Sequence, residues 1–238
     1  MNSSTFNSLP NSIFAYWVSK SFVSIFSKSR PLSDYGEPKQ GIATADNNRF
    51  LRQWFEVSVY KECFSATDSI NAFYTGKKWF PYNKGGEFRK WYGNQDYVIN
   101  YYLDGKELKE FKNSVLRNPQ FYFNESLSWS KVSGGNIAFR YYPNGFLFDV
   151  AGCSIFVDED EKRRYINGII NSSVANYILK AISPTINYEV GQIANLPIIE
   201  SLHSMMAVNE YVKNNISICK EEWDFYETSW NFKKHPLI

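Results

Sequence analysis

Apolar residues recur at three- and four-residue steps in three stretches of the chain, and each stretch predicts an amphipathic helix. The first stretch covers residues 11–27 and ends before Arg30-Pro31, because the residue before proline is disfavoured in a helix. The second follows residues 158–161, whose acids suit the positive end of a helix dipole. Residues 171–173 interrupt it with a possible serine cap, and Pro184 ends it.

The third stretch predicts a long helix over residues 201–230. Its apolar positions step alternately by three and four residues, which forms a heptad seam with one polar member. Such a seam predicts packing on another helix, either in this chain or in a part of the protein outside it. The seam positions are Leu202, Met205, Asn209, Val212, Ile216, Cys219, Trp223, Tyr226 and Trp230.

Residues 31–160 favour β-structure, and their clearest element is a hairpin. Residues 136–142 and 146–150 form its two arms, and Pro143-Asn144-Gly145 forms the turn, because Asn-Gly favours tight hairpin turns. Other strand or extended candidates are Glu56–Val59, Tyr97–Tyr102, 121–123, 127–132 and 193–199.

Together these patterns predict an α+β fold with a twisted, mostly antiparallel sheet, flanking helices and a long C-terminal helix. We expect three parts. Residues 1–30 form a polar segment and a helix, residues 31–200 form the α+β domain, and residues 201–238 form the long helix and a tail.

Composition is that of an ordinary globular protein, with 44% hydrophobic and 21% charged residues. Aromatic residues are abundant at 18%, which fits an aromatic β core or, alternatively, a binding surface. The net charge of +2 does not by itself identify a nucleic-acid-binding protein. Residues 77–90, however, hold five cations and one acid, so a locally basic face is possible.

The cysteine and histidine content argues against disulfides and structural zinc. Cys63, Cys153 and Cys219 are odd in number and widely spaced, and only His203 and His235 accompany them. This pattern, with no secretory leader, fits a cytoplasmic protein. We expect no membrane partner, because lysine and serines interrupt the apolar residues 13–26.

Motifs for methyl transfer and cofactor binding are missing from these 238 residues. Amino-methylating enzymes hold the flipped base with an Asn/Asp-Pro-Pro-aromatic loop, whereas Asn118-Pro119-Gln120-Phe121 lacks the second proline and is interpreted as a turn. Gly85-Gly86 and Gly134-Gly135 are isolated pairs that predict tight turns. We therefore assign no catalytic residue, no metal ligand and no cofactor to this chain.

A small metal-dependent nuclease is a less favoured alternative, because it requires carboxylates and a lysine around an ion. The candidates are Asp149 with residues 160–162, and Asp96 with residues 107–109. The acids at 158–161 serve equally well at a helix N-terminus. Asp149 is more simply interpreted as a structural hydrogen-bonding acid.

Residues 37–52 (EPKQGIATADNNRFLR) are the most informative stretch for binding. Amide side chains can pair with adenine and arginine with guanine, whereas lysine and threonine suit phosphates. An ordinary polar loop is the alternative. The stretch resembles the start of the target-recognition region of PglX-type adenine-specific DNA methyltransferases of BREX phage-defence systems, and more loosely type IIG restriction-modification enzymes and type I specificity subunits.

The resemblance continues in order along nearly the whole chain. It is carried by residues 13–18 (IFAYWV), 78–93 (KWFPYNKGGEFRKWYG), 126–133 (SLSWSKVS), 145–156 (GFLFDVAGCSIF), 165–199 and 226–232 (YETSWNF). It departs at Ala45, where the family pattern has glycine. If that position needs a positive φ, alanine would strain the loop.

The resemblance implies that this chain recognises a DNA sequence as a fragment of a longer adenine-N6 methyltransferase. The implied partners are double-stranded DNA, a methyltransferase domain outside this chain that uses S-adenosylmethionine, and other defence proteins. Whether this chain has an activity of its own stays open, and we expect it to methylate nothing alone. The alternative is a docking module that uses the heptad seam.

The candidate DNA contacts combine the polar stretch with basic residues elsewhere. Lys84, Arg89 and Lys131 are phosphate candidates together with Lys39 and Thr44. Arg140 lies in the predicted sheet and faces either DNA or solvent. Candidates for base or backbone contact are Gln40, Asn47, Asn48, Arg49 and Arg52.

Overall fold

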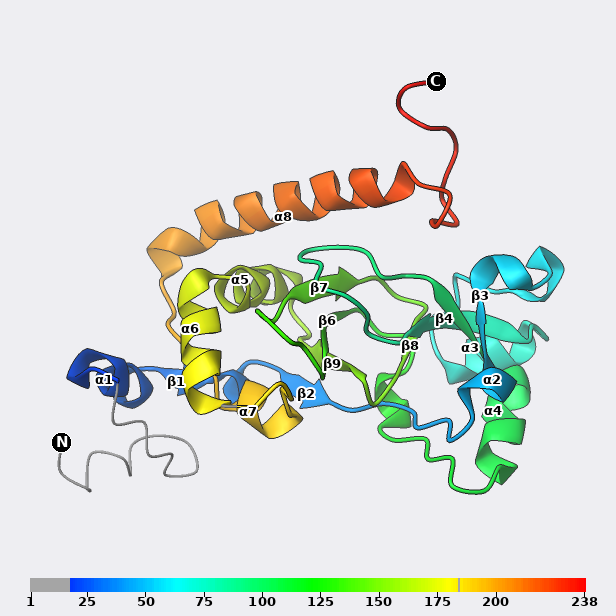
Figure 1. Ribbon diagram of the computed structural model, residues 1–238, viewed down its shortest axis with the longest axis horizontal. Helices are drawn as coiled ribbons and strands as arrows, with labels where there is room; N and C mark the ends of the chain where they lie inside the picture. The colour runs from blue at the N-terminus through cyan, green and yellow to red at the C-terminus, as the bar shows by residue number, and fades with distance from the viewer. Residues whose placement is uncertain (1–17, 184) are drawn as a thin grey trace.

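The computed structural model describes residues 18–183 and 185–238 (Figure 1). Helices are α1 (Lys20–Lys28), α2 (Asn47–Phe50), α3 (Ser69–Tyr74), α4 (Tyr102–Glu110), α5 (Asp160–Ile170), α6 (Ser173–Ile182), α7 (Val190–Ala194) and α8 (Leu202–Asp224). Strands are β1 (Arg30–Pro31), β2 (Glu37–Lys39), β3 (Leu51–Gln53), β4 (Trp79–Asn83), β5 (Tyr97–Asn100), β6 (Ser126–Ser130), β7 (Phe139–Tyr142), β8 (Leu147–Phe148), β9 (Gly152–Phe156) and β10 (Pro197–Ile198).

Two four-stranded sheets form the centre of this α+β fold. The first has the order β2-β9-β6-β7 and is antiparallel throughout. The second has the order β3-β5-β4-β8, in which only the β4–β8 pair is parallel. The mostly antiparallel sheet and the long C-terminal helix are confirmed, although the β-structure is divided into two sheets and a short β1–β10 ribbon.

A buried polar junction joins the two sheets where β4 of one meets β9 of the other. The Asn83 amide Nδ2 donates to the Ser128 hydroxyl at 2.6 Å and to the Gly152 carbonyl at 3.0 Å. Next to it, the Asp149 carboxylate lies 2.7 Å from both the Tyr82 hydroxyl and the Lys84 ammonium. Because buried polar groups are costly unless they are paired, these bonds fix the relative position of the sheets.

Each sheet carries its own hydrophobic cluster. The first sheet packs Trp129, Phe139 and Ile155 against the helices that follow it in the chain. The second sheet packs an aromatic cluster that includes Phe80 and Tyr101, whose rings meet edge to face. Of the two interpretations of the high aromatic content, the structure favours an aromatic core, since the largest fully buried hydrophobic side chains include Trp129, Tyr82, Tyr101, Tyr142, Phe50, Phe80, Phe123 and Phe139.

The helices after residue 160 begin where local sequence signals predict. Asp160 and Glu161 occupy the first turn of α5, and the Ser172 hydroxyl caps α6 by accepting from the Ala175 N–H at 3.1 Å. α8 lies along α5 (Figure 1). Gly168 of α5 permits this close approach, because a Cβ there would lie 2.6 Å from a methyl carbon of Val208. The seam of α8 therefore packs on a helix of this same chain.

Several expected elements differ in the structure. The helix predicted over residues 11–27 is described only from Lys20, and its first part lies outside the described residues. Residues 56–59 are not a strand: Glu56 ends one 3-10 turn (Trp54–Glu56) and Val59 begins another (Val59–Lys61). The long helix ends at Asp224 rather than at residue 230.

The hairpin predicted around Pro143-Asn144-Gly145 is wrong. β7 pairs with β6 in the first sheet, whereas β8 pairs with β4 in the second sheet. The turn carries the chain between the sheets, because Gly145 and Phe146 bond to the backbone of Phe123 instead of to β7. Of the other candidates, 127–132 is confirmed by β6, residue 121 belongs to a 3-10 turn (Pro119–Phe121), and 193–199 is split between α7 and β10.

The junction predicts a stability test at Asn83. We expect Asn83→Ala to lower the free energy of unfolding by about 3 kcal/mol, because it removes the donors that satisfy Gly152 and Ser128 in the buried junction. Urea unfolding followed by circular dichroism measures the change. Asn136→Ala, in an exposed loop, is the matched control and should change stability by less than about 0.5 kcal/mol. Equal effects would contradict the assigned role.

Candidate nucleic-acid interface

An anchored turn presents the polar residues before and within α2. The Ile42 N–H donates to the Phe148 carbonyl at 2.7 Å, and the side chains of Ile42 and Phe50 are fully buried on either side of the turn. The Asp46 carboxylate caps α2 by accepting from the Arg49 N–H at 3.0 Å. This turn is therefore held by the core, while Asn47 to Arg49 remain exposed.

Ala45 has a φ of 59°, so the glycine expected from the family pattern would suit this position better. Thr44 beside it is buried, and its hydroxyl donates to the Asn47 Oδ1 at 2.7 Å. Thr44 therefore positions Asn47 and is not exposed to a phosphate. Asn48 forms no side-chain hydrogen bond within the described part of the chain, so its amide is open to a ligand.

The two arginines of this stretch are held in place by their neighbours. Arg49 forms an ion pair with Glu107 at 2.7 Å and lies over the Phe111 ring. Arg52 donates to the Asn48 carbonyl at 2.6 Å, and its guanidinium lies 5.9 Å from the centre of the Trp79 ring. Half of the Arg49 side chain remains exposed, so it is both preorganised and accessible.

Three of the other predicted contacts lie on a separate part of the surface, near α7. Lys39 pairs with Glu37 at 2.8 Å. Gln40 and Lys131 both contact Glu189, Gln40 at 3.4 Å and Lys131 at 3.0 Å. These three residues are therefore separate from the α2 group, which consists of Thr44, Asn47, Asn48, Arg49 and Arg52.

Three cations of the predicted set are engaged in holding the fold together. Lys84 pairs with Asp149, which is 1% exposed and so is the structural acid expected from the sequence. Arg89 pairs with Glu222 of α8 at 2.5 Å and lies over the Trp223 ring. Arg140 is 1% exposed, and its guanidinium donates to the Glu87 carbonyl at 3.3 Å.

Arg140 is accordingly reassigned from the DNA contacts to the structural residues. Burial lowers the pKa of its guanidinium, and the Ser130 hydroxyl accepts one of its hydrogen bonds at 3.1 Å. A guanidinium enclosed in this way faces neither DNA nor solvent. No local sequence signal distinguishes it from an exposed strand arginine.

A basic cleft lies next to the α2 group and was not predicted from the sequence. It measures about 520 Å³, and its walls come from the 3-10 turn Val59–Lys61, the residues just before β4, the end of β5 and α4. Its lining residues are Tyr60, Lys61, Gly76, Lys78, Asn100, Tyr102, Leu103, Lys106, Glu107 and Glu110. Only Lys78 falls in the basic block of residues 77–90, which was the one available sequence signal.

The residues present do not fit a bound cofactor. Gly85 and Gly86 form a turn that is already filled, since a Cβ on Gly85 would lie 3.0 Å from the Ala151 carbonyl oxygen, and one on Gly86 would lie 2.8 Å from Asn94. In the turn at Asn118, the side-chain amide donates to the Gln40 carbonyl at 2.9 Å instead of facing open space.

The nuclease candidates are not assembled into a site. Asp160 pairs with Arg163 and Arg164, Asp149 pairs with Lys84, and Glu107 pairs with Arg49. Within residues 18–183 and 185–238, no three His, Cys, Asp or Glu side chains are grouped to hold a metal ion. In the same ranges, no helix is long and apolar enough to span a membrane.

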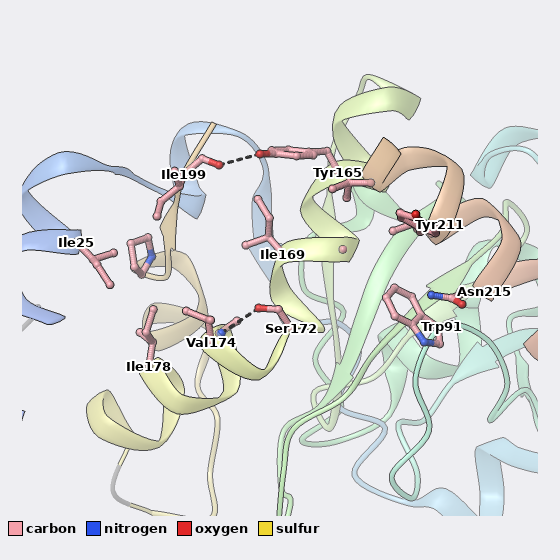
Figure 2. Close-up of a pocket in the computed structure, with 15 residues that line it drawn as sticks. Ile25, Trp91, Tyr165, Ile169, Ser172, Val174, Ile178, Ile199, Tyr211 and Asn215 are labelled. Carbon is pink, nitrogen blue, oxygen red and sulfur yellow. Dashed lines mark hydrogen bonds between the residues drawn. The ribbon is translucent and has the colours of Figure 1, made fainter. Parts of the chain in front are cut away.

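An apolar groove of about 410 Å³ lies at the other end of the molecule, between α1, α5, α6 and α8. Figure 2 shows Ile25, Ile169, Ile178 and Tyr211 around it, one from each of these helices. Among its lining residues, Val174, Ile199 and Tyr211 are more than half exposed. A groove of this kind with an exposed apolar rim is typical of a protein contact site.

Comparison with known proteins found two curated relatives, although no family model matches the chain. The chain is 36% identical over 241 residues to the adenine-specific methyltransferase PglX of Lacticaseibacillus casei (strain Zhang). It is 38% identical over 236 residues to the adenine-specific methyltransferase BrxX of Escherichia coli O9:H4 (strain HS). Each match covers 98% of this chain, but the chain spans only 20% and 18% of these relatives.

The strained turn before α2 predicts a stabilising substitution. We expect Ala45→Gly to raise the free energy of unfolding by about 1 kcal/mol, because glycine tolerates the positive φ. Thermal unfolding measures the shift. Ala43→Gly is the matched control: Ala43 lacks a positive φ, so glycine there should destabilise the protein by about 0.5–1 kcal/mol. If Ala45→Gly destabilised the protein as Ala43→Gly does, the positive φ at Ala45 would not be a source of strain.

Proposed function

We propose that this chain, which matches a segment of PglX-type adenine-specific methyltransferases over nearly its whole length, recognises the DNA sequence that such an enzyme methylates. The observation that carries the proposal is the exposed Asn47-Asn48-Arg49 group on a turn anchored in the core. Amide side chains pair with adenine and arginine pairs with guanine, and preorganised groups lose less entropy on binding.

The chemistry of methyl transfer belongs, in this proposal, to the rest of the methyltransferase. That part would bind S-adenosylmethionine and accept the flipped adenine, while this chain holds the surrounding duplex in register. The chain on its own would bind double-stranded DNA and methylate nothing.

The proposal predicts that this chain selects a short motif from a pool of random duplexes. We expect Asn48→Ala to weaken binding to the selected duplex by about tenfold to a hundredfold while hardly changing binding to a scrambled duplex, since one base contact contributes about 1–3 kcal/mol. Retention on immobilised chain at low salt, followed by sequencing and titration, measures both quantities.

Asn136→Ala serves as the control, because Asn136 is an exposed asparagine in the loop between β6 and β7. It should bind both duplexes like the unaltered chain. No motif enrichment with either this chain or a complete PglX-type methyltransferase that contains it would refute sequence recognition.

The apolar groove favours a second, compatible role in docking. The heptad seam was the expected docking surface, but it packs on α5, and Val212 is only 2% exposed. The groove beside it is open instead. Because the matched segment is about a fifth of each relative, we propose that the groove receives an apolar helix from the remainder of the methyltransferase.

Docking predicts that charge at the groove rim prevents assembly. We expect Val174→Glu with Ile199→Glu to weaken association with a separately produced methyltransferase region at least tenfold, because both side chains are exposed and would bring charge into an apolar contact. DNA binding by the chain should not change. Ile218→Glu, exposed on α8 but outside the groove, is the control. Unchanged association of the double variant in sedimentation analysis would exclude the groove.

A further inference from the structure

We infer that the basic cleft is a second DNA site, one that binds backbone phosphates of the duplex beside the bases recognised by the α2 group. This inference rests on the proposed function and adds a partner contact to it. Lys61, Lys78 and Lys106 converge on the cleft from three separate segments. Backbone hydrogen bonds hold these segments together, because the Lys78 N–H donates to the Lys61 carbonyl at 2.9 Å and the Lys78 carbonyl accepts from the Tyr101 N–H at 3.0 Å.

The cleft has an excess of positive charge, because three lysines and two glutamates line it, although the Lys78 ammonium also lies 5.3 Å from the centre of the Trp79 ring. Within the described part of the chain, the ammonium groups of its three lysines form no ion pair, unlike those of Lys84 and Lys131. Of the two acids in the lining, Glu107 is neutralised by Arg49, which leaves Glu110. An anion with several charges, such as a DNA backbone, matches this arrangement.

The ion pair between Arg49 and Glu107 also makes the cleft continuous with the α2 group. Glu107 accepts from the Arg49 guanidinium at 2.7 Å and from the Asn100 amide at 2.8 Å, and both Glu107 and Asn100 line the cleft. A duplex that contacts Asn48 and Arg49 would therefore pass its neighbouring backbone across the lysines.

Two exposed tyrosines add hydrogen-bonding groups that suit phosphates. Tyr60 is 84% exposed and Tyr102 is 46% exposed, so both side chains are accessible to a ligand in the cleft. Tyrosine hydroxyls are common phosphate donors in protein–DNA interfaces. The backbone of the turn at Tyr60 is fixed by the Lys77 ammonium, which donates to the Tyr60 carbonyl at 2.5 Å.

The wall formed by α4 contains a left-handed turn. Leu103, Asp104 and Gly105 have φ values of 51°, 58° and 68°, which cost non-glycine residues about 1–2 kcal/mol each. The turn is stabilised by the Tyr101 hydroxyl, which donates to Asp104 at 2.8 Å. Gly105 is buried against the Tyr101 ring, whereas the Leu103 side chain remains exposed at the cleft. Strained backbone of this kind is enriched at binding sites.

The test compares two charge-matched triple variants of this chain. Lys61→Gln, Lys78→Gln and Lys106→Gln remove the lysines of the cleft. Lys20→Gln, Lys28→Gln and Lys180→Gln remove the same charge from exposed positions on α1 and α6, at the opposite end of the molecule (Figure 1). Binding to the selected duplex and to a scrambled duplex is titrated between about 50 and 200 mM salt.

We expect the cleft variant to bind both duplexes more weakly, and by the same factor. The salt slope, which is the slope of the logarithm of the binding constant against the logarithm of the salt concentration, should become shallower by about 0.9 for each phosphate that the protein no longer neutralises. The control variant should keep the slope of the unaltered chain. Equal salt slopes for the cleft variant and the control variant would overturn the cleft site. This holds even if Asn48→Ala abolishes the preference for the selected motif, because that result concerns only the α2 group. Circular dichroism checks folding, and the double variant Lys61→Gln with Lys106→Gln replaces the triple if Lys78→Gln unfolds the chain.

The experiment also separates this inference from sequence recognition. A reduced salt slope in the cleft variant, with no motif preference in the unaltered chain, would support the cleft and refute recognition by the α2 group. No DNA binding at low salt, by the chain or by a complete methyltransferase that contains it, would overturn both.

Discussion

The buried junction at Asn83 and Asp149 determines how the rest of the molecule is arranged. Its Asn83 side chain joins the two sheets through buried hydrogen bonds to Ser128 and Gly152, so neither sheet can shift without leaving polar groups unpaired. It also reaches the binding surface. The Tyr82 hydroxyl, which contacts Asp149, lies 3.2 Å from the carbonyl of Ile42 at the base of the polar turn. The position of α2 therefore depends on a polar cluster in the core.

Lysines and arginines of this chain differ in whether another part of the protein pairs with their charge. Lys84, Arg89 and Arg140 link segments that are far apart in the sequence, and their partners are carboxylates or backbone carbonyls. Lys61, Lys78 and Lys106 have no such partners within the described residues. Under the proposed function, DNA would contact the cations that form no ion pair within the described residues, and the net charge of +2 gives no indication of where these cations lie.

Features set by neighbouring residues could be predicted from the sequence, and features set by distant residues could not. The α5–α6 boundary follows from a serine cap three residues from its donor, and the strain at Ala45 follows from one backbone position. The hairpin prediction was wrong because the Asn-Gly signal fixes a turn but not the strand that pairs beyond it, and Phe146 pairs with Phe123. Likewise, Arg89 and Glu222 are 133 residues apart, so no local pattern indicates that they meet.

The separation between the anchors of the polar turn and its exposed side chains has an evolutionary consequence. Ile42 and Phe50 hold the turn in the core, whereas Asn48 is exposed and forms no side-chain hydrogen bond within the described residues. Substitution of Asn48 should therefore leave the stability of the scaffold nearly constant. Under the proposed function, relatives that share this scaffold could change which base is contacted at this position without changing the fold.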